Sequence, residues 1–318
     1  MLTAASGPRI AAAFGLGGDA VLTGPVARGE KGQVWRLETG RGRYAVKDAF
    51  EDVDAAAATA DAAYQDVVRA SGVPMPAVLR SADDRVLVEV DGQPVRVYAW
   101  VDVLPRDRRL DAAVVGRVVA QVHGAVVPAD EPMSGWYADP VGADRWHDLV
   151  GRLERGGAPF AADLASLVPQ VLAVEEVLEP VRATQWCHRD LWADNVVATP
   201  SGGVVVLDWE SSGPGNPSHE VAAVLVEFGD GDVGRMRDLY AAYVDAGGPG
   251  RITRAGDLTV LVAQLGHIAV LGCERWLSST TDTERAHHEA WVREYVDEPV
   301  TLEIVDLVLE AVSSRRRP

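Results

Sequence analysis

The segment from His188 to Asn195 carries a carboxylate and an amide at a defined spacing. It matches the pattern H-R-D-L-x-x-x-N, in which the aspartate orients a hydroxyl group and the asparagine binds Mg²⁺. Asp190 and Asn195 occupy these two positions. A carboxylate can accept a strong hydrogen bond from a hydroxyl group that is losing its proton, so Asp190 is expected to act as the base. The pattern indicates transfer of a phosphoryl group to a hydroxyl group.

A second carboxylate, Asp208, directly follows the apolar run 204–207. Amide and carboxylate oxygens are ligands that Mg²⁺ prefers, so Asn195 and Asp208 are predicted to hold the metal, with Asp208 bridging it to nucleotide phosphates. The alternative is that Asp190 and Asn195 cap a loop and that Asp208 lies in a turn. The combined spacing and the preceding apolar strand favour the metal site.

Lys47 ends the apolar strand 44–47, as in the V-A-I-K strand whose lysine binds the α- and β-phosphates of a nucleotide. A lysine at a strand end can also be a solvated edge residue. Upstream, 29–34 is similar to the second half of a glycine-rich loop that covers phosphates, and this predicts nucleotide contacts for Gly29, Gly32 and Val34. Position 27 is Ala where such a loop has Gly, so a simple hairpin turn remains an alternative.

Further nucleotide contacts are predicted from position in the chain. An acidic residue of the following helix normally pairs with the strand lysine, and Asp61 is the best-placed candidate for Lys47. Trp100 and Val101 would offer backbone groups to an adenine edge. Apolar walls for the base are expected from Ala45 and Leu207.

The elements that position these residues form two predicted lobes. The first, 1–101, is a nucleotide-binding lobe of five short strands and one main helix, 55–70. Period-two alternation predicts strands at 33–39 and 44–47. A second strand pair, 86–90 and 95–99, is expected around the Asp91-Gly92 turn.

From residue 102 onward the pattern is mostly helical, which predicts a larger catalytic and substrate-binding lobe over 102–318. Apolar residues recur three and four positions apart from Leu110 to Val122. A helix is also predicted over 161–178. Helices are expected through most of 220–312, with breaks at 229–234, 247–250 and 278–283. The uncharged segment 258–273 is interpreted as a buried helix, because it is shorter than a membrane span and contains Gln and His. The fold class is α+β.

Composition limits the functions that the chain can have. With 318 residues, 47% of them hydrophobic, the chain can bury a substantial core. Its formal net charge of −17 argues against binding to nucleic acid or to anionic membranes. The excess negative charge is interpreted first as a source of solubility, with attraction of a cationic substrate as the alternative. The two cysteines can form neither a disulfide framework nor a four-cysteine zinc site, which favours the cytoplasm.

Several other residues are interpreted as structural. His188 is expected to shape its loop by hydrogen bonding, and Cys187 to be a small buried hydrophobic residue. The neighbours His287 and His288 would point in different directions on a helix, so a solvated face is favoured over a metal site. Four tryptophans are expected in the core, with a substrate pocket as the alternative: Trp136, Trp146, Trp276 and Trp291.

Taken together, these motifs resemble the aminoglycoside phosphotransferase and choline-kinase-like family of antibiotic and small-molecule kinases. The resemblance extends over 29–47, 72–76, 116–124, 188–195 and 207–215. It implies a bilobal protein-kinase-like fold that uses ATP, with GTP not excluded, and Mg²⁺. The chain departs from the family at Asp61, where Glu is usual, and at Glu220, where Asp is usual.

The resemblance implies a phosphotransferase that acts on a hydroxyl group of a small molecule, with an aminoglycoside or related cationic antibiotic as the leading acceptor. A protein kinase is disfavoured, because the chain has no room for a long activation segment after Asp208. The alternatives are a kinase for a sugar, an amino alcohol or homoserine, and a nucleotide-binding pseudokinase. Glu227, Asp230 and Glu274 are candidate contacts for the acceptor's amino groups. The oligomeric state stays open.

Overall fold

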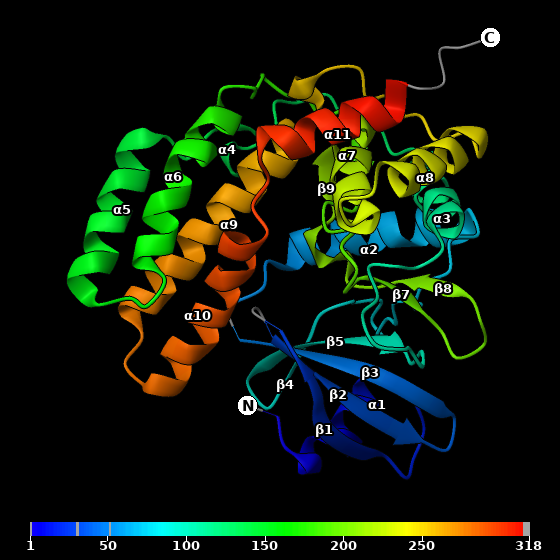
Figure 1. The fold of residues 1–318 in the computed structure, drawn as a ribbon. Coiled ribbons are helices and arrows are strands. Elements are labelled where there is room, and N and C mark those ends of the chain that lie inside the picture. The colour runs from blue at the N-terminus through cyan, green and yellow to red at the C-terminus, as the bar shows by residue number, and fades with distance from the viewer. Residues whose placement is uncertain (1, 30–31, 51, 314–318) are drawn as a thin grey trace. The chain divides into compact units, whose positions relative to one another are not determined.

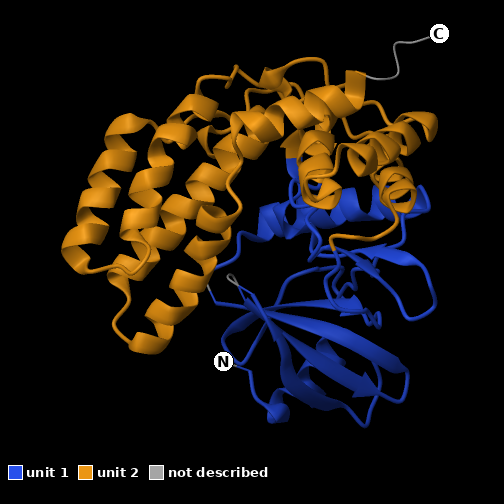
Figure 2. Ribbon diagram, viewed as in Figure 1, with its two compact units in different colours: residues 1–107, 188–213 blue, residues 108–187, 214–318 orange. Residues whose placement is uncertain are grey.

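The computed structural model describes residues 2–29, 32–50 and 52–313 as two compact units (Figure 2). Unit 1 comprises Met1–Asp107 and His188–Gly213. Unit 2 comprises Arg108–Cys187 and Pro214–Pro318. The segment with the predicted metal and base residues therefore packs together with the N-terminal strands. The lobe boundary expected between residues 101 and 102 remains a prediction.

Unit 1 contains an antiparallel sheet with the strand order β1-β2-β3-β5-β4 (Figure 1). Its strands are β1 (Val21–Arg28), β2 (Gly32–Thr39), β3 (Gly42–Ala49), β4 (Val88–Val90) and β5 (Gln93–Ala99). Asp91 and Gly92 connect β4 to β5 with φ angles of 55° and 72°. Two successive positive φ angles are typical of the tight hairpin turn that this dipeptide predicts.

Buried and partly exposed residues alternate along β2, so one face of the sheet packs in the core. Residues 33, 35 and 37 of β2 are buried, whereas their neighbours are partly exposed. Leu37 and Val46 pack in one cluster with Ile10 of α1 (Gly7–Ala13), which follows the short 3₁₀ helix η1 (Ala4–Ser6). The Ala-rich helix α2 (Ala55–Ala70) begins where the Asp54 side chain accepts hydrogen bonds from the amides of residues 56 and 57.

The second segment of unit 1 contains a small hairpin and a 3₁₀ turn. Strands β7 (Val196–Ala198) and β8 (Val204–Val206) are antiparallel, and η2 (Trp209–Ser211) follows. Backbone hydrogen bonds connect this segment to the N-terminal part of the unit. The amide of Val206 donates to Pro74 O at 2.8 Å, and the amide of Leu104 donates to Ala198 O at 2.8 Å.

Unit 2 is mostly helical (Figure 1). Its helices are α3 (Ala112–Gly124), α4 (Gly135–Ala138), α5 (Ala143–Gly156), α6 (Ala161–Glu175), α7 (Pro217–Gly229), α8 (Val233–Asp245), η3 (Ala255–Leu258), α9 (Thr259–Ser278), α10 (Asp282–Asp297) and α11 (Leu302–Ser313). The strand β6 (Gln185–Cys187) lies in this unit, and β9 (Gly213–Gly215) ends in it. Inside the unit, the amide of Thr184 donates to Gly215 O at 2.8 Å.

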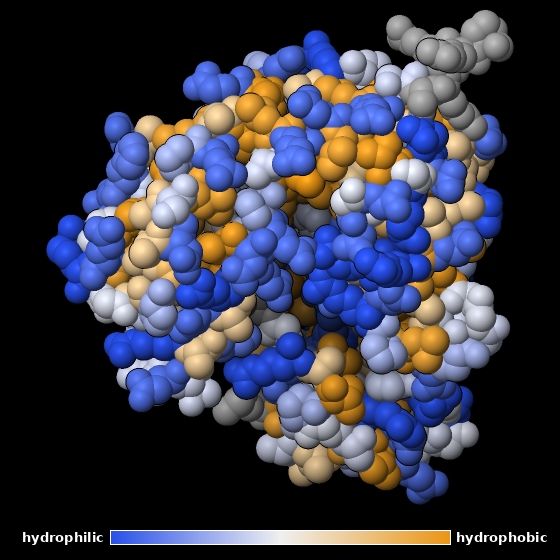
Figure 3. Space-filling model, viewed as in Figure 1, coloured by the Kyte–Doolittle hydropathy of each residue, from blue (hydrophilic) through white to orange (hydrophobic). Residues whose placement is uncertain are grey.

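The helix α9 supplies much of the core of unit 2. Ala255–Ser278 is long and apolar enough to cross a membrane, but 72% of its most apolar window is buried inside the protein. Cys273 and Trp276 of α9 pack with Trp146 and Phe160 in one cluster. The interpretation of 258–273 as a buried helix is therefore confirmed. On the face drawn in Figure 3, by contrast, hydrophilic residues are widespread.

Candidate functional site

The predicted catalytic loop joins β6 to β7 and is held by hydrogen bonds within unit 1. His188 Nε2 donates to Leu207 O at 2.9 Å, which confirms its expected structural role. Asn195 Nδ2 donates to both Asp190 O and Asp190 Oδ2 at 2.9 Å. The two predicted chemical residues of the loop are therefore in direct contact. The amide oxygen of Asn195 is the atom that can serve as a metal ligand, since the amide nitrogen is a donor and here donates to Asp190.

Asp208 lies next to this loop, at the end of β8. The amide of Leu207 donates to Asn195 O at 2.7 Å and so brings Asp208 beside the loop. Asp208 has left-handed backbone angles (φ 53°, ψ 67°), as does Arg189 in φ (64°). Non-glycine residues in this conformation concentrate at functional sites. The Asp208 side chain is 43% exposed, so its carboxylate is accessible to a ligand.

These oxygen donors fit a magnesium ion. Mg²⁺ binds oxygen ligands, usually one or two carboxylates, and completes its octahedron with water and phosphate. Asn195 and Asp208 supply an amide and a carboxylate oxygen from adjoining backbone segments. Asn195 is half-buried and Asp208 is exposed, which leaves room for the remaining ligands.

Lys47 meets Asp208 in the same unit. The register of the sheet pairs Lys47 of β3 with Val34 of β2 and with Arg96 of β5. Lys47 Nζ lies 2.7 Å from Asp208 Oδ1 and 3.0 Å from Glu210 Oε2. Burial lowers the pKa of Lys47, but the two carboxylates outweigh this effect and raise the pKa above its usual value. Lys47 is therefore a fixed cation beside the predicted metal ligands.

The expected pairing of Asp61 with Lys47 is not formed. Asp61 lies on α2 as predicted, but its oxygens accept hydrogen bonds from Arg96 at 2.5 and 2.9 Å. Both side chains of this pair are almost completely buried. Burial raises the pKa of the Asp61 carboxyl, and the hydrogen bond from Arg96 opposes this shift. The Asp61 carboxylate is therefore paired with the buried Arg96 of β5 and not with Lys47.

The sequence interpretation missed Glu210 and Arg96. Glu210 contacts Lys47, and its Oε1 accepts a hydrogen bond from Tyr98 at 3.2 Å. The one sequence signal was the position of Glu210 two residues after Asp208. Arg96 gave no signal beyond its place in a strand, because its partner is distant in the sequence.

The predicted phosphate-covering loop connects β1 to β2 as a hairpin. The amide of Gly29 donates to Gly32 O at 2.9 Å. A Cβ atom at Gly32 would lie 2.6 Å from Asp48 O, so only glycine fits against the adjacent strand. Glu30 and Lys31 lie outside the described residues. Val34 is half-buried on the same face as Lys47, and nucleotide binding by this loop stays a prediction.

The residues predicted to contact adenine differ in whether their groups are already engaged within the protein. Ala45 and Leu207 are both half-buried. The amide of Trp100 donates to Arg43 O at 3.1 Å, so this amide is already used inside the sheet. Val101 is half-buried and follows the end of β5. The contacts of these residues with a base stay predictions.

The three candidate acceptor contacts lie in unit 2 and form ion pairs there. Glu227 is buried, and its carboxylate lies 3.5 Å from Arg108. Asp230 lies 2.9 Å from Arg109. Glu274 accepts two hydrogen bonds from Arg152, at 2.7 and 2.6 Å. These arginines would compete with the acceptor's amino groups for the three carboxylates. Binding of the acceptor by these residues remains a prediction.

Glu274 also lines a cavity of about 290 Å³ in unit 2. Its other lining residues are Trp136, Arg145, His267, Val270 and Leu271. Trp136 is 38% exposed, and its ring stacks on His267 with 5.4 Å between centroids. Trp146 and Trp276 are buried in the core as expected, whereas Trp136 is available to a ligand.

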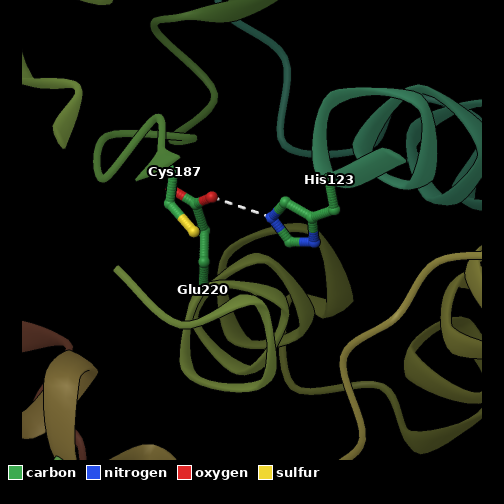
Figure 4. Close-up of side chains that lie close together, drawn as sticks. All are labelled: His123, Cys187 and Glu220. Atoms are coloured by element: carbon green, nitrogen blue, oxygen red, sulfur yellow. Dashed lines mark hydrogen bonds and ion pairs between the residues drawn. The ribbon is translucent and has the colours of Figure 1, made fainter. Parts of the chain in front are cut away.

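Glu220, where the chain departs from the family, belongs to a buried cluster in unit 2. Figure 4 shows His123, Cys187 and Glu220, whose ligand-type atoms lie within 4.8 Å of one another. His123 Nε2 lies 2.8 Å from Glu220 Oε2, and His123 Nδ1 lies 2.8 Å from Tyr243 Oη. Both ring nitrogens of His123 are therefore already used. The cluster is a buried hydrogen-bond network between α3 and α7.

Comparisons with known proteins concern the family and the fold of the chain. A family model described as "Phosphotransferase enzyme family" matches residues 23–258. A search of curated proteins gave no match. The solved structures that are similar include a spectinomycin phosphotransferase in complex with ADP and spectinomycin, at 13% identity over 92% of both chains with a TM-score of 0.63.

Two further structures have the same fold. An aminoglycoside phosphotransferase from Alicyclobacillus acidocaldarius is 17% identical over 92% of both chains, with a TM-score of 0.58. An ethanolamine kinase from Plasmodium vivax is 9% identical over 90% of this chain and 84% of its own, with a TM-score of 0.54. The predicted fold class, a five-stranded sheet with one main helix followed by a mostly helical part, is confirmed.

Proposed function

Since this chain belongs to the phosphotransferase enzyme family, we propose that it uses ATP and Mg²⁺ to phosphorylate a hydroxyl group of a small molecule, with an aminoglycoside or related cationic antibiotic as the leading acceptor. The observation that carries the proposal is the 2.7 Å contact between Lys47 and Asp208. It joins the strand lysine to the segment that holds Asp190 and Asn195, which gives phosphoryl transfer its cation, metal ligands and base within one unit.

Each residue has a distinct task in this mechanism. Asp190 accepts the proton of the attacking hydroxyl group, and the 2.9 Å hydrogen bond from Asn195 Nδ2 orients its carboxylate. Asn195 Oδ1 and the Asp208 carboxylate would hold Mg²⁺, which when bound neutralises phosphate charge. Lys47 would bind the α- and β-phosphates through its ammonium group.

Three observations support a small acceptor that carries positive charge. The helix α7 begins at Pro217, so the segment after Asp208 is too short for the activation loop of a protein kinase. The net charge of −17 produces a field that attracts cations. Two of the similar structures are named as phosphotransferases for spectinomycin and for aminoglycosides.

The second candidate is an amino-alcohol kinase, and the similarity to an ethanolamine kinase favours it. An amino alcohol also combines a cation with a hydroxyl group, so the charge argument applies equally. Sugar and homoserine kinases remain alternatives within the same chemistry, and a nucleotide-binding pseudokinase is disfavoured because Lys47, Asp190, Asn195 and Asp208 are all present.

A coupled assay of ADP release over a panel of acceptors tests the proposal. The panel contains aminoglycosides, spectinomycin, ethanolamine, aminopropanol, homoserine and neutral sugars, each with ATP and with GTP. We expect turnover with at least one cationic acceptor and an absolute requirement for Mg²⁺. Turnover with neutral sugars alone would contradict the proposed acceptor class, and binding of nucleotide without any turnover would favour the pseudokinase.

A further inference from the structure

Glu210 lies at the centre of a charged network beside Lys47. It belongs to η2, two residues after Asp208, and its side chain is 29% exposed. Oε2 lies 3.0 Å from Lys47 Nζ. Oε1 accepts a hydrogen bond from Tyr98 at 3.2 Å and lies 3.7 Å from Arg96. The carboxylate is thus held on both sides, with one oxygen directed at the lysine.

Asp61 cannot serve as a second anchor for the lysine without exposing a buried charge. Its carboxylate makes two hydrogen bonds to Arg96, and the two side chains are 8% and 5% exposed. Removing one partner from such a buried pair leaves the other charge uncompensated, which is strongly destabilising. The Asp61–Arg96 pair instead supports Glu210, because Arg96 also faces Oε1.

Lys47 bridges two carboxylates that have different tasks. Asp208 is a proposed metal ligand, so its carboxylate would be shared between Lys47 and Mg²⁺ when nucleotide is bound. Glu210 is not a proposed metal ligand, and η2 is held by packing, since the Trp209 ring lies 4.5 Å from the His188 ring and 5.9 Å from the Tyr64 ring, centroid to centroid. A contact that persists while Asp208 binds metal can keep the ammonium group in place.

We infer that Glu210 is the positioning residue that holds Lys47 for the nucleotide phosphates, the task that the sequence suggested for Asp61. The inference rests on the proposed function, because it presumes that Lys47 binds ATP. In this chain, the anchor of the lysine comes from the turn after the metal ligand rather than from the helix α2. In this role Glu210 would act through Lys47, with which it is in contact.

A double-mutant cycle tests this dependence. The affinity for Mg·ATP is measured by displacement of a fluorescent ATP analogue from the wild type, Glu210→Gln, Lys47→Met and the double variant. We expect Glu210→Gln to weaken binding about tenfold, as for loss of a charge-assisted hydrogen bond. In the Lys47→Met background the same change should have no further effect, because the residue through which Glu210 acts is gone.

The remaining variants separate positioning from structure. Asp61→Asn should lower the melting temperature, because it removes the charge that compensates the buried Arg96. Asp83→Asn, which removes an exposed carboxylate paired with Arg85, is the matched control and should change nothing. If Glu210→Gln does not fold, Glu210→Asp, which keeps the charge but shortens the reach, replaces it in the cycle with the same expectation.

In steady-state assays with an active acceptor, the KM for ATP should rise more than kcat falls for Glu210→Gln. Equal losses from Glu210→Gln in both backgrounds would overturn the inference while leaving the proposed function intact. A wild-type protein that does not bind Mg·ATP would overturn both.

Discussion

At the scale of single residues, the candidate site is a chain of short contacts. Asp190 is bonded to Asn195, the backbone of Asn195 is bonded to Leu207, and Asp208 pairs with Lys47. Each contact fixes the next side chain, so the base, the metal ligands and the cation hold one arrangement before any ligand binds. Such preorganisation lowers the cost of orienting reactants.

Asp190→Asn tests the role of the base. The amide keeps the size of the carboxylate and its contact with Asn195, but it cannot accept the proton of the hydroxyl group. We expect kcat to fall by about 10²–10⁴-fold. The affinity for Mg·ATP should stay within about twofold of the wild type, since Asp190 does not bind the phosphates. Measurement of single-turnover transfer beside nucleotide binding checks both statements, and normal turnover would show that another group is the base.

The sequence was informative about these residues because the chemistry requires fixed spacing along the chain. The segment from His188 to Asn195 and the strand before Asp208 are local patterns, and they come together as expected. The partner of Lys47 was predicted wrongly, because Asp61 was chosen for its place on a helix. The choice between Asp61 and Glu210 depends on Arg96, which lies opposite Lys47 on the adjacent strand β5 and cannot be located from local spacing.

At the scale of elements, the helices α3 and α8 pack closely in unit 2. A Cβ atom added at Gly116 of α3 would lie 2.3 Å from Leu239 O and 3.0 Å from the amide nitrogen of Tyr243. Backbone atoms cannot move aside as a flexible side chain can. The same pair of helices carries His123 and Tyr243, so this crossing also sets the buried network at Glu220.

Gly116→Ala should therefore destabilise the protein by about 3 kcal/mol, through overpacking at the helix crossing. The matched control is Gly151→Ala on α5, where the added Cβ would meet only the flexible side chain of Arg155 at 3.3 Å. That variant should gain up to about 1 kcal/mol from helix propensity. Denaturant unfolding of both variants measures the difference, and equal effects would mean that the crossing is looser than described.

Elements with strong local signals were predicted well. The helix α2 matches the predicted range 55–70, and the turn at Asp91-Gly92 joins β4 to β5 as expected. The first strand, β1, was not located in the sequence, since Gly24 and Pro25 interrupt it and most of its residues are exposed. The strand β7 has three residues and depends on pairing with β8, so its formation is a tertiary effect.

At the scale of the whole molecule, stability depends on buried groups that titrate. His219 of α7 is 8% exposed, and burial lowers its pKa to about 4, while the Asp257 charge opposes this shift. The unfolded chain has the ordinary value of 6.5, so it binds a proton more readily than the folded protein does. This contribution to stability is complete above pH 6.5 and is lost as the pH falls toward 4.

When the pH falls from 7 to 5, the titration of His219 should therefore lower the free energy of unfolding of the wild type by about 2 kcal/mol. His219→Gln removes the titrating group and should show a correspondingly smaller loss over the same range. His147→Gln, which changes an exposed histidine of α5, is the control and should keep the wild-type slope. Urea unfolding at pH 7, 6 and 5 measures the slopes, and identical slopes for all three proteins would contradict the assignment.

The central claim is that Lys47, Asn195 and Asp208 form one site for Mg·ATP beside the base Asp190. The most direct test is calorimetric titration of ATP into the wild type and Asp208→Asn at increasing Mg²⁺ concentration. We predict that Mg²⁺ strengthens binding of ATP to the wild type and that Asp208→Asn loses this dependence, with affinity about 10- to 100-fold weaker at saturating Mg²⁺. An unchanged Mg²⁺ dependence in Asp208→Asn would contradict the claim.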